Sequence, residues 1–323
     1  MTTIISERHF FKFYISILLF ALFWGLLSLA TGVLSDQGTT LFGRIMMIAM
    51  SAGLAFMVFY TIFRYYKNAP RIVVNDNSIA FNSKVYYWRD LEKIEMTGKR
   101  PFKFMGERKE GVVLKFKGEK ERYIFDDMYE NTAQIKSFIQ QVIIDKKPFD
   151  IISKSEIVFS AIANEIPKYY KGLQFFCYEG AIIWFFILGF LYVLILSINT
   201  LNFEFSGALF VLTMPIVIIL SFRMYYFGLS ENYLVVRNHD FFWVKKFHQI
   251  SNIKEVVFEQ RHNMPVSLRV INNDFTSKLY PATTLGSKKW LALKADLESK
   301  GVKVRNECVY YEPFKFKFKF FND

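Results

Sequence analysis

The chain has 323 residues, of which 52% are hydrophobic and 19% aromatic, and its 41 Lys and Arg against 29 Asp and Glu give a net charge of +12. This aromatic content excludes an intrinsically disordered chain, and only two cysteines exclude a disulfide-stapled scaffold or a Cys-rich metal module. A chain both apolar and basic is typical of a protein whose apolar part lies in lipid and whose basic part faces an anionic surface.

Four long apolar segments follow one another in two pairs. They are residues 13–34, 45–63, 180–198 and 205–222, and none contains Asp, Glu, Lys or Arg. About 20 apolar residues form a helix long enough to cross a hydrocarbon core roughly 30 Å thick. The sequence therefore predicts four transmembrane helices in two hairpins.

The connecting segments set the expected orientation. Residues 35–42 and 199–204 carry no Lys or Arg, and Arg44 is the one cation near the outer edge of a span. The cations that flank the other ends are Arg64, Lys67, Arg71, Lys168, Lys171 and Arg223. Because Lys and Arg favour the cytoplasmic side, we expect both termini and both soluble segments to be cytoplasmic.

The two soluble segments resemble each other, which predicts an internal duplication. An Arg and a Tyr pair follow both hairpins, and residues 72–74 and 91–94 match 234–236 and 250–253. Each segment reads as short strands closed by one amphipathic helix. Residues 135, 138, 139 and 142 form the apolar stripe of the first helix, and residues 290, 293 and 297 form that of the second.

This pattern resembles the bacterial pleckstrin-homology-like domains that follow transmembrane hairpins, through the strand series, the closing helix and the segment Trp88-Arg89-Asp90-Leu91-Glu92-Lys93-Ile94. The resemblance implies an α+β membrane protein with a PH-like β-sandwich or barrel after each hairpin, in the bacterial inner membrane. The expected division is an N-terminal tail with hairpin 1 (1–66), module 1 (67–147), a linker (148–174), hairpin 2 (175–227) and module 2 (228–323).

The motifs that carry catalysis are missing from the sequence. None of the four His residues has metal-ligand spacing to another His or to a Cys, and no phosphate loop, nucleophile elbow or zinc signature is present. We therefore expect no enzyme, no catalytic residue, no metal and no cofactor.

Two basic features are candidate contacts to the membrane or a partner. The first is a loop with interleaved aromatic residues: Lys99, Arg100, Phe102, Lys103, Phe104, Arg108 and Lys109. It reads either as a solvated hairpin tip or as a contact to anionic headgroups, with the rings entering the interface. The second is the tail, where Lys315, Lys317 and Lys319 alternate with Phe. This tail reads as a strand on its own domain, a membrane contact or a partner contact.

The leading functional hypothesis is a non-catalytic scaffold or sensor in the inner membrane. Its paired cytoplasmic modules would bind anionic phospholipid headgroups or a protein partner, including a second copy, and no nucleic acid, since lipid is the nearer polyanion. The alternative is an immunity or envelope-defence protein that neutralises a membrane-active toxin. A small-molecule transporter is disfavoured, because the spans lack the ionisable residues that such pathways use.

Overall fold

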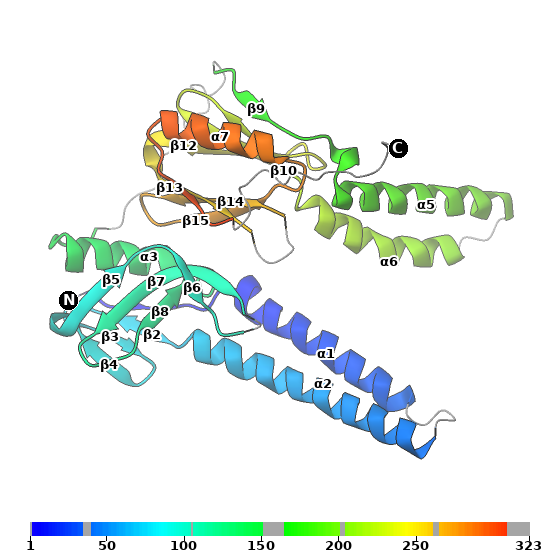
Figure 1. The fold of residues 1–323 in the computed structure, drawn as a ribbon, viewed down its shortest axis with the longest axis horizontal. Helices are drawn as coiled ribbons and strands as arrows, with labels where there is room; N and C mark the ends of the chain where they lie inside the picture. Colours follow the sequence, from blue (N-terminus) through cyan, green and yellow to red (C-terminus); the bar gives the residue numbers. More distant parts are fainter. Residues whose placement is uncertain are drawn as a thin grey trace, which may run out of the picture. The chain divides into compact units, whose positions relative to one another are not determined.

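The computed structural model of the chain describes residues 2–34, 40–104, 106–150, 165–200, 204–260 and 265–308. The protein is a mixed α+β fold that divides into two units, Met1–Ser153 and Lys154–Asp323. In each unit, a pair of long helices extends from a module of two mainly antiparallel sheets and one further helix (Figure 1).

Three helices in the described part of the chain are long and apolar enough to cross a membrane, which indicates membrane association. They are Phe10–Leu29, Leu41–Asn68 and Tyr178–Asn199. The helix pair of unit 1 consists of α1 (Ser16–Leu34) and α2 (Leu41–Asn68), and the π-helical turn η1 (Phe10–Ile15) leads into α1. The helix pair of unit 2 consists of α5 (Tyr178–Thr200) and α6 (Glu204–Ser221). The fourth predicted span coincides with α6, an 18-residue helix that contains Pro215.

The surfaces of these helices suit lipid better than water. Large apolar side chains such as Leu19, Phe59 and Phe185 are exposed along them, and exposed apolar area in water costs about 25 cal/mol per Å². One polar link joins α1 to α2. The hydroxyl of Ser28 donates to the backbone carbonyl of Ser51 at 2.9 Å, and the hydroxyl of Ser51 donates to the backbone carbonyl of Ser28 at 2.8 Å. This reciprocal pair satisfies both hydroxyls inside an apolar setting.

Unit 1 contains two sheets and a closing helix. The first sheet has the order β1 (Ile4–Ile5), β2 (Ile72–Val74), β3 (Ser78–Phe81) and β4 (Lys84–Tyr87). After the 3-10 turn η2 (Trp88–Asp90), the second sheet consists of β5 (Leu91–Glu95), β6 (Lys99–Pro101), β7 (Arg108–Phe116) and β8 (Arg122–Phe125). The closing helix is α3 (Thr132–Phe138), which continues as the π-helical turn η3 (Ile139–Ile144).

The strand β1 corrects the expected domain division, in which residues 1–66 were a tail and a hairpin only. Ile4 and Ile5 precede the helix pair, yet they pair with Val74 and Val73, which follow it. The amide of Glu7 also donates to Asn131 Oδ1 at 3.0 Å, which ties this segment to the start of α3. The helix pair is therefore inserted between two neighbouring strands of one sheet. A two-residue strand is too short for period-two alternation to reveal it.

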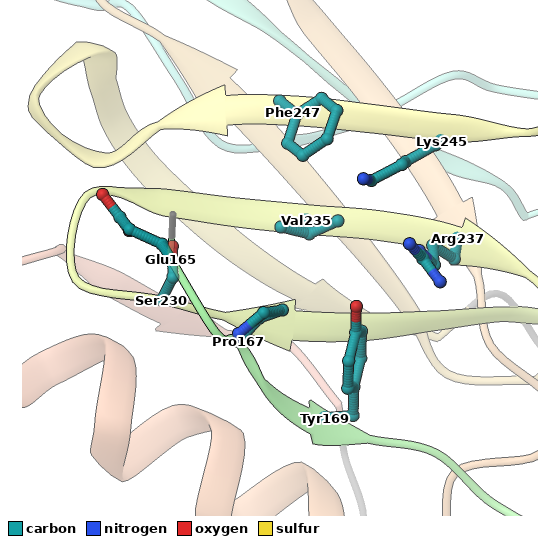
Figure 2. A pocket seen from close by; sticks show the side chains of 8 residues that line it. All are labelled: Glu165, Pro167, Tyr169, Ser230, Val235, Arg237, Lys245 and Phe247. Carbon is teal, nitrogen blue, oxygen red and sulfur yellow. The ribbon is translucent and has the colours of Figure 1, made fainter. Parts of the chain in front are cut away.

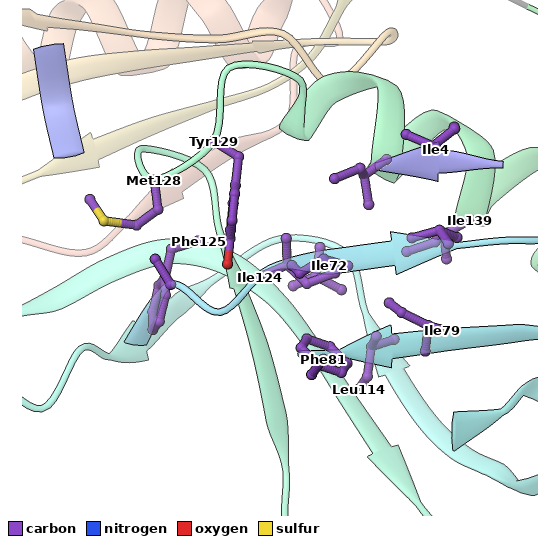
Figure 3. Close-up of a cluster of buried hydrophobic side chains, with 14 of the residues drawn as sticks. Ile4, Ile72, Ile79, Phe81, Leu114, Ile124, Phe125, Met128, Tyr129 and Ile139 are labelled. Atoms are coloured by element: carbon purple, nitrogen blue, oxygen red, sulfur yellow. The ribbon is translucent and has the colours of Figure 1, made fainter. Parts of the chain in front are cut away.

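The two sheets and the closing helix of unit 1 share one hydrophobic core. Ile72, Ile79 and Phe81 come from the first sheet, Leu114 from the second and Ile139 from the closing helix, and their side chains gather in one cluster (Figure 3). The predicted apolar stripe of this helix is confirmed for residues 135, 138 and 139, which are fully buried.

Unit 2 repeats this arrangement. Its first sheet has the order β9 (Lys168–Tyr170), β10 (Tyr225–Leu229), β11 (Tyr233–Asn238) and β12 (Lys245–Gln249), and the 3-10 turn η5 (Ile250–Asn252) follows. Its second sheet contains β13 (Ile253–Glu259), β14 (Ser267–Asn272), β15 (Ser277–Pro281) and β16 (Val304–Asn306), and its closing helix is α7 (Ser287–Ser299). The strand β9 lies in the segment expected to be a linker, 148–174, and pairs with β10 across the second helix pair.

Matching hydrogen bonds support the predicted duplication. The amide of Trp88 donates to the carbonyl of Asn77 at 3.1 Å, and the amide of Ile250 donates to that of Asn232 at 2.8 Å, each at the start of a 3-10 turn. The strand after this turn has an irregular register at its second residue in both units. A shared irregularity is stronger support than shared strand order, because bulges are specific features of a fold.

The alignment of the two halves expected from the sequence is wrong in two places. It is off by one strand near the helix pairs and by three residues after the 3-10 turns. Residues 72–74 form β2, whereas 234–236 lie in β11, the counterpart of β3. Leu91 corresponds to Ile253 and not to Ile250, because each directly follows its 3-10 turn. The strand mismatch arises because Arg64 lies within α2, whereas Arg223 follows α6, so the first strand after the helix pair begins sooner in unit 2. A longer loop in unit 2 contributes to the second difference: residues 239–244 connect β11 to β12, and only residues 82 and 83 connect β3 to β4.

Candidate membrane-surface site

The basic loop predicted as a contact surface is a hairpin in unit 1. Lys99 and Arg100 lie in β6, and Arg108 and Lys109 begin β7. The two strands pair in antiparallel register, with Arg100 opposite Lys109. The hairpin brings the predicted residues of this loop together, as expected of a segment between two strands.

The two rings of this loop are buried inside unit 1, whereas one of the two interpretations of the sequence placed them in the membrane interface and the other in a solvated hairpin tip. Phe102 is fully buried and lies 5.3 Å from the ring of Tyr65 in α2. Phe104 is 1% exposed, and its ring lies 5.7 Å from that of Phe20 in α1 and 6.2 Å from that of Tyr60 in α2. Residues two apart in an extended segment point the same way, here toward the helix pair. We call Phe102 and Phe104, with the rings they contact, the aromatic clamp.

Part of the loop's charge is also engaged inside unit 1. Arg100 forms an ion pair with Glu95. Lys109 Nζ lies 3.4 Å from Glu107 and 4.3 Å from the centre of the Phe102 ring, and its side chain is only 9% exposed. Lys99 is partly buried, and the two cations that face solvent are Lys103 and Arg108. The loop therefore fastens the module to its helix pair rather than presenting five free cations. The tail residues Lys315, Lys317 and Lys319 lie outside the described residues.

Unit 2 has exposed aromatic rings near its helix pair. The 3-10 turn η4 (Gln174–Phe176) leads into α5, and Phe176 and Tyr178 there are 87% and 78% exposed. The β11–β12 loop adds Phe242, which is 84% exposed, and Trp243, which is also exposed. This loop lies at the foot of the helix pair, because the ring of Phe241 is 4.7 Å from that of Phe222, just after α6.

A groove of about 800 Å³ accompanies these rings at the foot of α5. It lies between the segment that enters α5 and the loop that leads into α7. Lys288 and Lys289 contribute cations, and Phe176 and Tyr178 contribute apolar walls. The one carboxylate in the lining, Glu179, is paired with Arg223 at 3.4 Å. Exposed aromatic rings beside cations at the end of an apolar helix are typical of the interface between membrane and water.

Part of this site has a signal in the sequence that the predictions above did not use. The run Phe241-Phe242-Trp243 lies between two polar strand ends, and aromatic residues in such a turn indicate a contact surface. The groove could not be found in this way, because Phe176 and Lys288 are more than a hundred residues apart in the chain. Within the described residues, no cluster of three or more His, Cys, Asp or Glu side chains has the arrangement that a metal ion requires.

No known protein-family model matches the chain, and no curated protein is similar to it in sequence. The resemblance to bacterial PH-like domains therefore stays a prediction. The assignment of function depends on the geometry of the two units.

Phe242 is expected to lie in the membrane interface. We predict that a fluorophore on Phe242→Cys, with Cys177 and Cys308 replaced by Ala, has blue-shifted emission in proteoliposomes and is quenched by lipids with spin labels near the headgroup. The matched control is Ser83→Cys, which lies in the equivalent but shorter loop of unit 1 and is exposed. Emission from position 242 that is as solvent-like as that from position 83 would contradict this placement.

Proposed function

We propose that the chain is a non-catalytic integral membrane protein that holds two β modules against the anionic face of a membrane. The observation that carries the proposal is the insertion of each helix pair between two paired strands, β1 with β2 and β9 with β10. A module built in this way is fixed at the membrane surface by two connections, because one strand leads into the helix pair and the neighbouring strand follows it. A flexible linker would leave its orientation free.

In this proposal, all four long helices span the membrane, and both modules and both termini are cytoplasmic. Support comes from the cations at the module ends of the helices, such as Arg64, Lys67, Lys171 and Arg223, against Arg44 at the opposite end. Lys and Arg near the ends of spans favour the cytoplasmic side. The bacterial inner membrane is the membrane that the resemblance implies.

We also propose that each module is PH-like. A sheet of four strands, a second sheet built on three antiparallel strands, and a single helix that closes the core occur in both units. In this interpretation, the helix pair occupies the loop between the first two strands of the domain. The resemblance seen in the sequence thus applies to a module whose first strand precedes its hairpin.

The proposed ligand of the junction groove in unit 2 is the headgroup layer of anionic phospholipids. Lys288 and Lys289 would face the phosphates, and Phe176 and Tyr178 would enter the interface beside them. Each Lys or Arg near an anionic membrane surface contributes about 1 kcal/mol. The hairpins already hold the protein in the membrane, so these contacts set the orientation and mobility of the module.

The experiment is hydrogen exchange of the full chain in nanodiscs of phosphatidylcholine alone or with phosphatidylglycerol. We expect the segments 172–178 and 283–289 to exchange more slowly in the anionic discs. The difference should shrink from 0.1 M to 1 M salt, because the Debye length falls from about 10 Å to about 3 Å.

A matched pair of variants separates these contacts from a general charge effect. Lys288→Gln/Lys289→Gln should remove the lipid-dependent protection, whereas Lys117→Gln/Lys120→Gln, which removes two exposed cations of unit 1, should leave it unchanged. Equal exchange in neutral and anionic discs would overturn the proposed ligand.

A further inference from the structure

One face of the first sheet differs between the two units. In unit 2, a row of opposed residues crosses the sheet: Tyr169, Gly228, Val235 and Phe247. The corresponding row of unit 1 consists of Ile5, Val73, Ala80 and Val85. Unit 1 thus has only small and branched aliphatic side chains in this row. Unit 2 has two aromatic rings, a valine and, in the strand β10, a glycine. The same backbone carries a different surface.

This difference produces a pocket of about 200 Å³ on unit 2. Its lining consists of Glu165, Pro167, Tyr169, Ser230, Val235, Arg237, Lys245 and Phe247. Figure 2 shows Val235 as the floor, with Lys245, Arg237 and the hydroxyl of Tyr169 directed toward one end. At the other end, Glu165 is already engaged, because it accepts hydrogen bonds from the amide and the side chain of Asn232 at 3.1 and 2.8 Å.

The two cations of this pocket have no carboxylate partner in the described part of the chain. Arg237 and Lys245 lie directly opposite each other on neighbouring strands, and like charges in this position repel. Arg237 lies 5.6 Å from the centre of the Tyr169 ring, and its Nε is buried without a hydrogen-bond acceptor. A buried donor without an acceptor is costly unless a ligand supplies one.

The shape of the pocket depends on Gly228. A Cβ at this position would lie 2.8 Å from the ring of Tyr169 and 3.1 Å from Cβ of Pro167. The absence of a side chain lets both residues of the neighbouring segment lie flat against the sheet. The equivalent residue of unit 1 is Val73, which has a branched side chain and lies opposite Ile5.

From this geometry we propose that the pocket binds a small phosphate ester. The phosphate is held at the end formed by Arg237, Lys245 and the Tyr169 hydroxyl, and the organic part rests on Val235, Pro167 and Phe247. The fork of a guanidinium matches two phosphate oxygens, and a lysine adds a point charge. The ester is either a soluble metabolite or the headgroup of a phospholipid, which share this chemistry. The site is separate from the junction groove, and its binding does not depend on the proposed function.

The test is calorimetric titration of the full chain in a neutral maltoside micelle. The probes are glycerol 3-phosphate as the soluble ester and dihexanoyl phosphatidylglycerol as the lipid headgroup, with butyrate as a carboxylate of similar size. We expect at least one phosphate probe to bind and butyrate to bind at least about tenfold more weakly. Binding of the lipid alone identifies a headgroup site, and binding of glycerol 3-phosphate identifies a site for soluble esters.

Variants connect this binding to the pocket. Arg237→Gln/Lys245→Gln should weaken it at least about tenfold, since it removes charge-assisted hydrogen bonds. Its melting temperature should equal or exceed that of the wild type, because the repulsion between the two cations is removed. Arg237→Lys keeps the charge but loses the fork, and Gly228→Ala displaces the Tyr169 ring, so both should also weaken binding. Lys117→Gln/Lys120→Gln is the charge-matched control. Binding by neither phosphate probe, equal binding of butyrate, or unchanged affinity of the double variant would overturn the proposal.

Discussion

Phe104→Ala should destabilise unit 1 by about 3–5 kcal/mol, the usual cost of deleting a buried Phe side chain. Phe104 is 1% exposed and contacts Phe20 of α1 and Tyr60 and Tyr65 of α2. Its removal leaves a cavity between the β6–β7 loop and both helices. The free energy of unfolding can be measured by urea titration and pulse proteolysis of the full chain in micelles.

The matched control for this substitution is Phe242→Ala, which deletes the same ring from an exposed position in unit 2. An exposed substitution of this kind usually changes stability by less than about 0.5 kcal/mol. Hydrogen exchange adds a local measurement: in Phe104→Ala, the last turn of α2, at Tyr65–Asn68, should exchange faster than strands β7 and β8. A loss of stability no larger than that of Phe242→Ala would show that the aromatic clamp does not couple module and helix pair.

The clamp also illustrates which features of this fold the sequence can predict. The interleaving of Phe102 and Phe104 with cations was visible, and it predicted either a solvated hairpin tip or a contact of the rings and cations with headgroups. It could not show that the rings face the protein's own helices. This depends on Phe20 and Tyr60, which lie far away in the chain and reach the loop only through the inserted helix pair.

Local patterns were sufficient for most strands, the long helices and the apolar stripes of the closing helices, because each has its own periodicity. They were insufficient for β1 and β9, whose two or three residues pair with strands beyond a whole hairpin. They also failed for buried charges. Lys136 is fully buried in α3 and lies 2.6 Å from Asp126, and Arg269 lies 3.0 Å from Glu259 in the second sheet of unit 2. A hydropathy scale assigns such residues to the solvent-exposed surface, because it takes no account of the ion-pair partners that let them be buried.

The insertion of the helix pairs gives these local features a common consequence. Because β1 and β2 enter the sheet from opposite ends of one hairpin, a movement of α1 relative to α2 would be transmitted to the edge of the first sheet. The pocket on unit 2 lies on the equivalent sheet, and its wall residue Tyr169 belongs to β9, the strand that precedes the inserted helix pair. The wall of the pocket and α5 are therefore joined by a short stretch of chain, residues 171–177.

His248 should make the stability of unit 2 depend on pH between about 6.5 and 4. Burial is the largest cause that lowers the pKa of this imidazole from 6.5 to about 4. The charges of Lys278 and Lys246 act in the same direction, and a hydrogen bond with Asn272 opposes them. Between pH 6.5 and about 4, His248 is therefore protonated in the unfolded chain but stays neutral in the folded chain. The contribution of His248 to the free energy of unfolding is fully present above pH 6.5 and decreases as the pH falls through this window. Below about pH 4 it no longer changes, after a total loss of about 3 kcal/mol.

The measurement is the free energy of unfolding of the full chain in micelles at pH 7 and at pH 5, for the wild type and for His248→Gln. The difference between the two proteins cancels the titration of the carboxylates, which they share. We expect the advantage of the wild type to shrink by about 2 kcal/mol over this interval, because glutamine does not titrate. Tyr280→Phe removes the hydroxyl that lies 2.9 Å from Nε2 of His248 but leaves the ring buried. Since burial is the largest cause of the lowered pKa, this variant should keep the pH dependence of the wild type. Parallel pH profiles for the wild type and His248→Gln would show that the imidazole is not kept neutral by the fold.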